Sequence, residues 1–155
     1  MDQSFLRRAL QWGNHGALEF CLICLLAGLV ALSPTGAVFA GPVEDGLTAA
    51  ARGDYATALR LWRPLAERGD VNAQLYVGLS YAHGRGVPID DATAALWYRM
   101  AAERGNAEAQ VDLGVAYESG RGVTRDLAKS VELYRRACQG GVEQACEWAK
   151  RLGGP

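Results

Sequence analysis

The sequence has no marked excess of positive or negative charge. Its 155 residues include 16 Lys and Arg against 17 Asp and Glu, which gives a formal net charge of −1, and the basic residues form no run. Proteins that bind nucleic acids concentrate positive charge, because release of counterions from the phosphates supplies much of their affinity. We therefore expect no nucleic-acid partner.

A hydrophobic run long enough to cross a membrane is also missing. The apolar stretch at 20–32 has 13 residues, whereas a transmembrane helix needs about 20. A stretch of this length, preceded by Arg7 and Arg8 and followed by small residues up to Ala40, is typical of a secretory signal peptide. We predict that residues 1–40 are this signal and that cleavage follows Ala40.

The compartment depends on that cleavage. A mature chain of residues 41–155 would be periplasmic or secreted and would not remain in the membrane. The alternative is an uncleaved leader that serves as an N-terminal membrane anchor, because the leader is long and carries Asp2 and Glu19.

Side chains that bind metals or carry out catalysis are scarce. Beyond the predicted leader the sequence has one histidine, His83, and two cysteines, Cys138 and Cys146. A zinc site usually needs about four ligands. No cluster of His, Cys or carboxylates offers a general base at helical spacing. We therefore expect no metal, no cofactor and no enzymatic activity.

What the sequence does contain is a repeat. Residues 73–108 align with residues 109–144 at an offset of 36 without a gap, and 14 of the aligned pairs are identical. A period between about 20 and 50 residues is typical of a solenoid, in which each unit buries its apolar face against its neighbours. The predicted units of the mature chain are a helix pair at 41–72, full repeats at 73–108 and 109–144, and a partial repeat or capping helix at 145–155.

Each repeat predicts two helices joined by a glycine-rich loop. Apolar residues in 73–81 share one face of a helix, and the loop at 83–88 then interrupts it. Asp90 or Asp91 can cap the second helix. That helix is expected to end just before Gly105, at the usual position of a C-terminal glycine.

Two glycines lie in the middle of predicted helices, at equivalent positions of the two repeats. Gly78 and Gly114 each cost about 1 kcal/mol relative to alanine at such a position. A cost that recurs in both repeats indicates that another group packs closely there. We expect that group to be a neighbouring backbone.

The shared residues carry a resemblance to a known family. The glycines and tyrosines of both repeats, their G-R-G-V loops, and the segment WYRMAAERGNAEAQ at 97–110 resemble the Sel1-like repeat, a relative of the tetratricopeptide repeat. The resemblance covers residues 73–146. It implies an all-α fold: a right-handed α-solenoid of antiparallel helix pairs with a short C-terminal capping helix, whose first helices line a concave face that holds other proteins.

The resemblance also implies which residues face a partner. The tetratricopeptide pattern, carried over in register on Gly78 and Gly114, gives apolar positions at the centre of the groove and polar positions towards its rim. Such a strip suits an amphipathic helix or an extended peptide. The predicted partner-binding residues are Leu47, Asn72, Leu75, Leu79, His83, Glu108, Val111, Val115 and Glu118.

Cys138 and Cys146 flank a Gly140-Gly141 turn near the end of the chain. A short turn between antiparallel helices can bring two Cα atoms within the 4.4–6.8 Å that a disulfide needs, and such a bond persists in an exported protein. The segment also resembles the cysteine-rich Sel1-like proteins, in which this spacing bridges two helices. We predict a disulfide; two unpaired buried thiols, or metal or redox chemistry, are the alternatives.

Two other functions compete with a peptide-binding module. Cysteine-rich Sel1-like proteins have been associated with binding or hydrolysis of β-lactams. Hydrolysis needs an activated serine, usually in S-x-x-K, and neither Ser80, Ser119 nor Ser130 has a lysine three residues later. The second alternative is self-association, in which the end repeats of two copies stack.

Overall fold

The structure, a computed structural model, describes residues 41–153. The predicted signal peptide lies outside these residues. The described part of the chain is helical throughout and has no strand, which confirms the expected all-α repeat fold. Its seven helices are α3 (Pro42–Ala51), α4 (Tyr55–Glu67), α5 (Val71–His83), α6 (Asp91–Glu103), α7 (Ala107–Ser119), α8 (Leu127–Gln139) and α9 (Glu143–Gly153).

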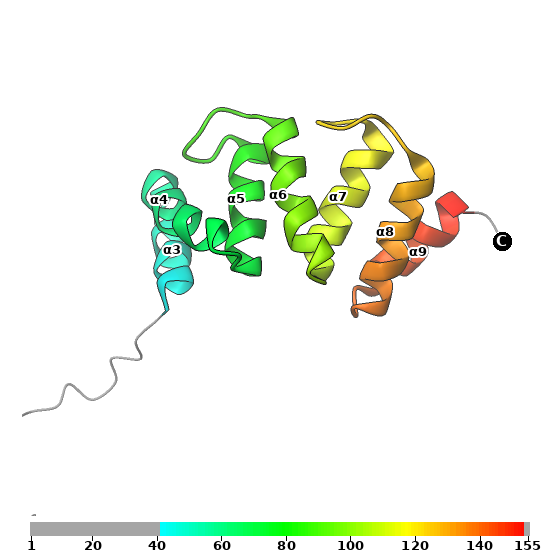
Figure 1. Ribbon diagram of the computed structural model, residues 1–155, viewed down its shortest axis with the longest axis horizontal. Coiled ribbons are helices and arrows are strands. Elements are labelled where there is room, and N and C mark those ends of the chain that lie inside the picture. The colour runs from blue at the N-terminus through cyan, green and yellow to red at the C-terminus, as the bar shows by residue number, and fades with distance from the viewer. Residues whose placement is uncertain (1–40, 154–155) are drawn as a thin grey trace, which may run out of the picture. The chain divides into compact units, whose positions relative to one another are not determined.

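The helices lie in a row in chain order (Figure 1). Each of them packs mainly against the helix before it and the helix after it. Interactions of this kind, confined to neighbours along the chain, are those of a solenoid. The row consists of three helix pairs, α3 with α4, α5 with α6 and α7 with α8, and ends with α9.

Most of the helices begin at an acidic or amide side chain that caps them. Asp90 accepts a hydrogen bond from the backbone N–H of Thr93 at 3.0 Å, and Asn106 accepts one from Ala109 at 2.8 Å. These caps satisfy N–H groups that have no partner inside the helix. Asp54, Asp70 and Asp126 cap α4, α5 and α8 in the same way.

The glycine-rich loops dock onto the preceding helix pair. A Cβ at Gly122, after α7, would overlap the carbonyl of Asp91 at the start of α6, and a Cβ at Gly86 would overlap that of Tyr55 at the start of α4. Both glycines also have a positive φ, which other residues adopt at a cost. The loop therefore holds Arg121 beside the N-terminal end of α6.

The mid-helix glycines face aromatic rings. The expectation that a neighbouring backbone is the group closest to them was therefore wrong. A Cβ at Gly78 would lie 2.7 Å from the ring of Tyr98, and a Cβ at Gly114 would lie 2.7 Å from that of Tyr134. A ring is wider than an aliphatic side chain, and glycine is the only residue that leaves it room here. The repeated glycine and tyrosine therefore form one packing unit.

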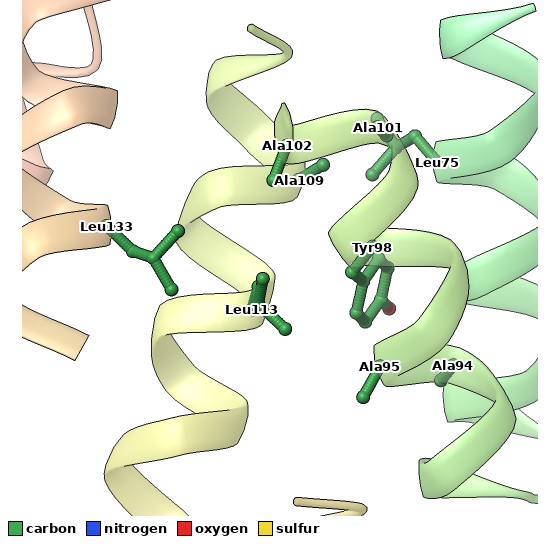
Figure 2. Close-up of a cluster of buried hydrophobic side chains, with 9 residues drawn as sticks. All are labelled: Leu75, Ala94, Ala95, Tyr98, Ala101, Ala102, Ala109, Leu113 and Leu133. Carbon is green, nitrogen blue, oxygen red and sulfur yellow. The ribbon is translucent and has the colours of Figure 1, made fainter. Parts of the chain in front are cut away.

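The core runs between neighbouring helix pairs. Its largest cluster takes Leu75 from α5, Tyr98 from α6, Leu113 from α7 and Leu133 from α8, with alanines between them (Figure 2). Small side chains let the helices approach closely and leave the larger residues to fill the remaining space. The cluster thus joins four successive helices.

Candidate functional site

The residues predicted to face a partner lie on α3, α5 and α7, and we call this set the inner face. Leu47 is 40% exposed, and Asn72, His83 and Glu108 are also exposed. Leu79, Val111, Val115 and Glu118 are half-buried. The inner face therefore combines accessible polar side chains with partly accessible apolar ones.

Leu75 was predicted together with these residues but is enclosed by the core, and the name inner face is used for the other eight. It is only 2% exposed and packs in the largest core cluster. Figure 2 shows it beside Ala101 of α6. The small side chains of Ala101 and Ala102, both fully buried, let α5 and α6 approach at this end and cover the leucine. In this structure the helix packing therefore leaves Leu75 inaccessible to a partner.

Two polar residues of the inner face are engaged within the chain. A carboxylate oxygen of Glu118 accepts a hydrogen bond from the Tyr134 hydroxyl at 2.8 Å, and the other lies 3.3 Å from the guanidinium of Arg151. The side-chain amide of Asn106 lies 3.5 Å from the Oδ1 of Asn72. These contacts fix Glu118 in particular at the end of α7.

A cleft of about 70 Å³ opens between α5, α6 and α7. It brings together His83 and Val115, which belong to successive repeats of the inner face. Its other lining residues are small apolar side chains and a group of polar ones. The polar residues are Asp91 and Tyr98 from α6, Asp112 from α7 and Arg121 from the following loop.

The repeat explains why the cleft exists. Three interfaces join each helix pair to the helix that follows it: α4 with α5 is the first, α6 with α7 the middle and α8 with α9 the last. In the first interface the rings of Trp62 and Tyr76 pack with their centroids 5.0 Å apart, and in the last interface those of Tyr134 and Trp148 are 5.3 Å apart. The 36-residue offset places Tyr98 and Asp112 at the same positions of the middle interface. A carboxylate thus replaces the second ring, and the space of that ring remains open.

The substituted carboxylate is held in an unfavourable environment. The pKa of Asp112 is raised to about 6. Burial is the largest cause, the negative charge of Glu108 adds to the rise, and the positive charge of Arg121 opposes it. Burial also raises the pKa of the Tyr98 phenol above its usual range, with Asp112 adding to the effect. Desolvation disfavours a charged group unless a partner compensates it.

The family is decided by comparison with known repeats. The sequence model of the Sel1 repeat family matches three consecutive segments of the chain, residues 39–70, 71–106 and 107–142. The chain belongs to the Sel1 repeat family. Proteins built from Sel1 repeats generally mediate interactions with other proteins and generally lack enzymatic activity.

Solved structures of Sel1 repeat proteins resemble this chain. A protective antigen of uropathogenic Escherichia coli strains that displays an SLR fold is 32% identical, with a TM-score of 0.69 over 72% of this chain and 25% of its own. A Sel1 repeat protein from Oxalobacter formigenes is 37% identical, with a TM-score of 0.61 over 63% of this chain and 28% of its own. The cysteine-rich protein B of Helicobacter pylori is 25% identical, with a TM-score of 0.57 over 59% of this chain and 68% of its own.

The Sel1 repeat chain described here spans about a quarter of the length of the first two of these proteins. A search of curated proteins finds no match. The likeness of this chain to the solved structures concerns the repeat fold.

The predicted disulfide is present in this Sel1 repeat chain. It joins Cys138 near the end of α8 to Cys146 in α9, with the two Cα atoms 4.9 Å apart. Tyr134 of α8 packs beside Trp148 of α9, and Ala137 and Ala145 are fully buried in the same cluster. The bond therefore ties the last helix of the row to the preceding pair.

The serines considered for catalysis are engaged or enclosed. The hydroxyls of Ser80 and Ser119 donate hydrogen bonds to carbonyls of their own helices, and Ser130 is fully buried. Within residues 41–153, no group of three or more His, Cys, Asp or Glu side chains could hold a metal ion. In the same part of the chain no helix is both long and apolar enough to cross a membrane.

Asp112 and Tyr98 were not singled out as functional candidates in the sequence analysis. The signal was present in the repeat register: positions 76, 112 and 148 read Tyr, Asp and Trp. A carboxylate between two aromatic residues marks the middle interface as different. Recognising it required knowing that these positions face the rings at 62, 98 and 134.

Proposed function

We propose that this Sel1 repeat chain binds a peptide or helix of a partner protein across its inner face. The observation that carries the proposal is the cleft shared by His83 and Val115, because they come from successive repeats. A segment that crosses α5 and α7 would contact both residues. The occupant is a protein, because Sel1 repeats generally serve as interaction modules.

The composition of the inner face supports this occupant. Leu47, Leu79 and Val111 give apolar contact area, and Asn72 and Glu108 are exposed polar residues beside it. An amphipathic helix or an extended peptide with alternating side chains can place apolar anchors on the first group and polar groups on the second. Burial of the apolar area would supply affinity, and the polar residues would set the register.

We also propose that the protein works outside the cytoplasm. The Cys138–Cys146 disulfide supports this location, because such bonds persist in oxidising compartments and are rare in the cytosol. The sequence before residue 41, which is typical of a signal peptide, supports it as well.

Photocrosslinking from defined positions tests the proposed face. A photoreactive residue is placed at position 79 or 115 of the full chain in the cells that express it naturally. The matched control is position 96 on α6, where Leu96 is 55% exposed and lies outside the inner face. We expect positions 79 and 115 to capture the same protein and position 96 not to capture it.

The captured protein must then bind the purified chain in solution. Equal capture from position 96 would contradict the inner face as the binding surface. Capture of a second copy of this chain alone would contradict a distinct partner and would indicate self-association.

A further inference from the structure

Two polar groups of the cleft lack a hydrogen-bond partner. Among residues 41–153 no group donates a hydrogen bond to the carboxylate of Asp112 or bonds to the hydroxyl of Tyr98. Both side chains line the same cleft and come from adjacent helices. Water reaches these polar atoms, because the fully buried side-chain atoms without a partner among residues 41–153 are Oε1 of Gln74 and Oγ of Ser130. The Asp112 carboxylate and the Tyr98 hydroxyl are therefore available to a group that enters the cleft.

The next interface shows how the chain satisfies these positions elsewhere. There the hydroxyl of Tyr134 donates to Glu118, and the ring of Trp148 fills the place that Asp112 takes in the middle interface. In the middle interface the position equivalent to Glu118 is Ala82, which offers no acceptor. The cleft therefore lacks both the ring and the acceptor.

The charges around the cleft favour a cation over an anion. Asp112 faces it from α7 and Asp91 from α6, and Glu108 lies one turn before Asp112. On the opposing side are Arg121 from the loop and His83 from α5. Arg121 forms no ion pair with Asp112 in the described part of the chain; the ion pairs there involve Asp126, Glu147 and Glu118.

We propose that the cleft between Tyr98 and Asp112 receives the cationic end of a lysine or arginine side chain of the partner protein. This inference rests on the proposed function and names the group that the inner face recognises. The cation would donate hydrogen bonds to the Asp112 carboxylate and to the Tyr98 oxygen. Val115 and the alanines of the cleft would contact the apolar stem of the same side chain.

The size of the cleft agrees with this occupant. A cavity needs at least about 10–15 Å³ to hold one water molecule, so about 70 Å³ accommodates an ammonium or guanidinium group. The opening lies beside the inner-face residues His83 and Val115. A side chain from a segment lying across α5 and α7 could therefore enter it.

The ionisation of Asp112 makes the binding depend on pH. Its pKa of about 6 in the free protein means that the carboxylate is charged at neutral pH and protonated below this value. A protonated carboxyl attracts a cation weakly, so affinity falls as pH decreases through about 6.

The test uses n-butylammonium, which is a lysine side chain without its backbone, and follows the Asp112 and Tyr98 amide signals by NMR. We expect saturable shifts at neutral pH with a dissociation constant in the millimolar range, as for a small fragment. Asp112→Asn should raise the dissociation constant by about tenfold or more, because it removes the charge that pairs with the cation. Asp112→Tyr, which restores the ring of the other interfaces, should abolish the shifts.

Three comparisons complete the experiment. Glu132→Gln, at an exposed position of α8, should leave the dissociation constant unchanged. Butyrate, with the same stem and a negative end, should give no saturable shift. Equal binding of butyrate, or equal binding of n-butylammonium by Asp112→Asn, would overturn the proposal, and so would the absence of saturable shifts in the unaltered protein.

The failure of this inference can be told apart from the failure of the proposed function. If n-butylammonium does not bind but position 115 still captures a partner, binding on the inner face is supported. The proposal that the cleft receives a basic side chain is then contradicted. If a partner is captured and the inference holds, replacing one lysine or arginine of that partner with methionine weakens binding to the unaltered chain. The same replacement then has little effect on binding to Asp112→Asn.

Discussion

Asp112 lines the same cleft as Tyr98, at the position where the two flanking interfaces each place a second aromatic ring. The repeat supplies the comparison within a single chain, because the three interfaces are equivalent in register and positions 76, 112 and 148 carry Tyr, Asp and Trp. The middle interface therefore lacks the packing of two rings and has a carboxylate in the cleft instead. Several measurable consequences follow from that exchange and from the packing around it.

Replacing Asp112 with asparagine should stabilise the protein at neutral and higher pH. The raised pKa means that the folded state binds this proton more tightly than the unfolded state, so stability is lost as pH rises from about 4 to about 6. Asp112→Asn removes that loss. We expect the free energy of unfolding to increase by about 1–2 kcal/mol at pH near 8 and to change little at pH near 4. Urea unfolding at both pH values measures this, with Glu132→Gln as the control. A gain that does not vary with pH would contradict the account.

Removing the disulfide should destabilise the end of the helix row. The chain-entropy model assigns about 2–3 kcal/mol to closing a loop of this length, and the bond ties α9 to α8. We expect Cys138→Ser combined with Cys146→Ser to lower the free energy of unfolding by this amount. Hydrogen exchange should show faster opening in α9 than in α5 or α6. A uniform increase across all helices would instead indicate that α9 is not held separately.

Adding a methyl group at Gly78 should destabilise the protein, although alanine is the better helix former. The new Cβ would lie 2.7 Å from the Tyr98 ring, and crowding of this kind typically costs about 1–3 kcal/mol. The matched comparison is Gly78→Ala together with Tyr98→Leu, in which the smaller side chain makes room. Thermal or urea unfolding of both single variants and the double variant should give a coupling energy of about 1 kcal/mol or more. Additive effects would show that the glycine and the ring do not act as a unit.

Gly122→Ala should cost more stability than Gly141→Ala. Both glycines have a positive φ, so both substitutions carry backbone strain. Only at Gly122 would the new Cβ also overlap the Asp91 carbonyl, because nothing lies within 4 Å of a Cβ at Gly141. We expect the difference in unfolding free energy between the two variants to be about 1 kcal/mol or larger. Equal losses would mean that the loop is not docked on α6 as described.

The repeat fold could be predicted from the sequence because its determinants are local and occur twice. Asp90 caps α6, as the sequence indicated, and Gly105 has the positive φ expected after a helix. The period of 36 residues fixed which segments are equivalent. The two cysteines were close enough in sequence for a short turn to join them.

The features that could not be predicted depend on how helices approach one another. The burial of Leu75 follows from the small residues Ala101 and Ala102 on the next helix, which the pattern of α5 alone does not contain. The partner of Gly78 is a ring that lies 20 positions further along the chain. The role of Asp112 appears only once positions 98 and 112 are known to meet.

The most direct test of the central claim is the affinity of the captured partner for two variants of the whole chain. Val115→Arg places a large charged side chain in the cleft of the inner face, and Leu96→Arg places the same side chain at an exposed position of α6 outside it. Calorimetry or surface plasmon resonance gives the dissociation constant for each. Binding on the inner face predicts a rise of about tenfold or more for Val115→Arg and no change for Leu96→Arg. The opposite order, or equal affinities, would contradict it.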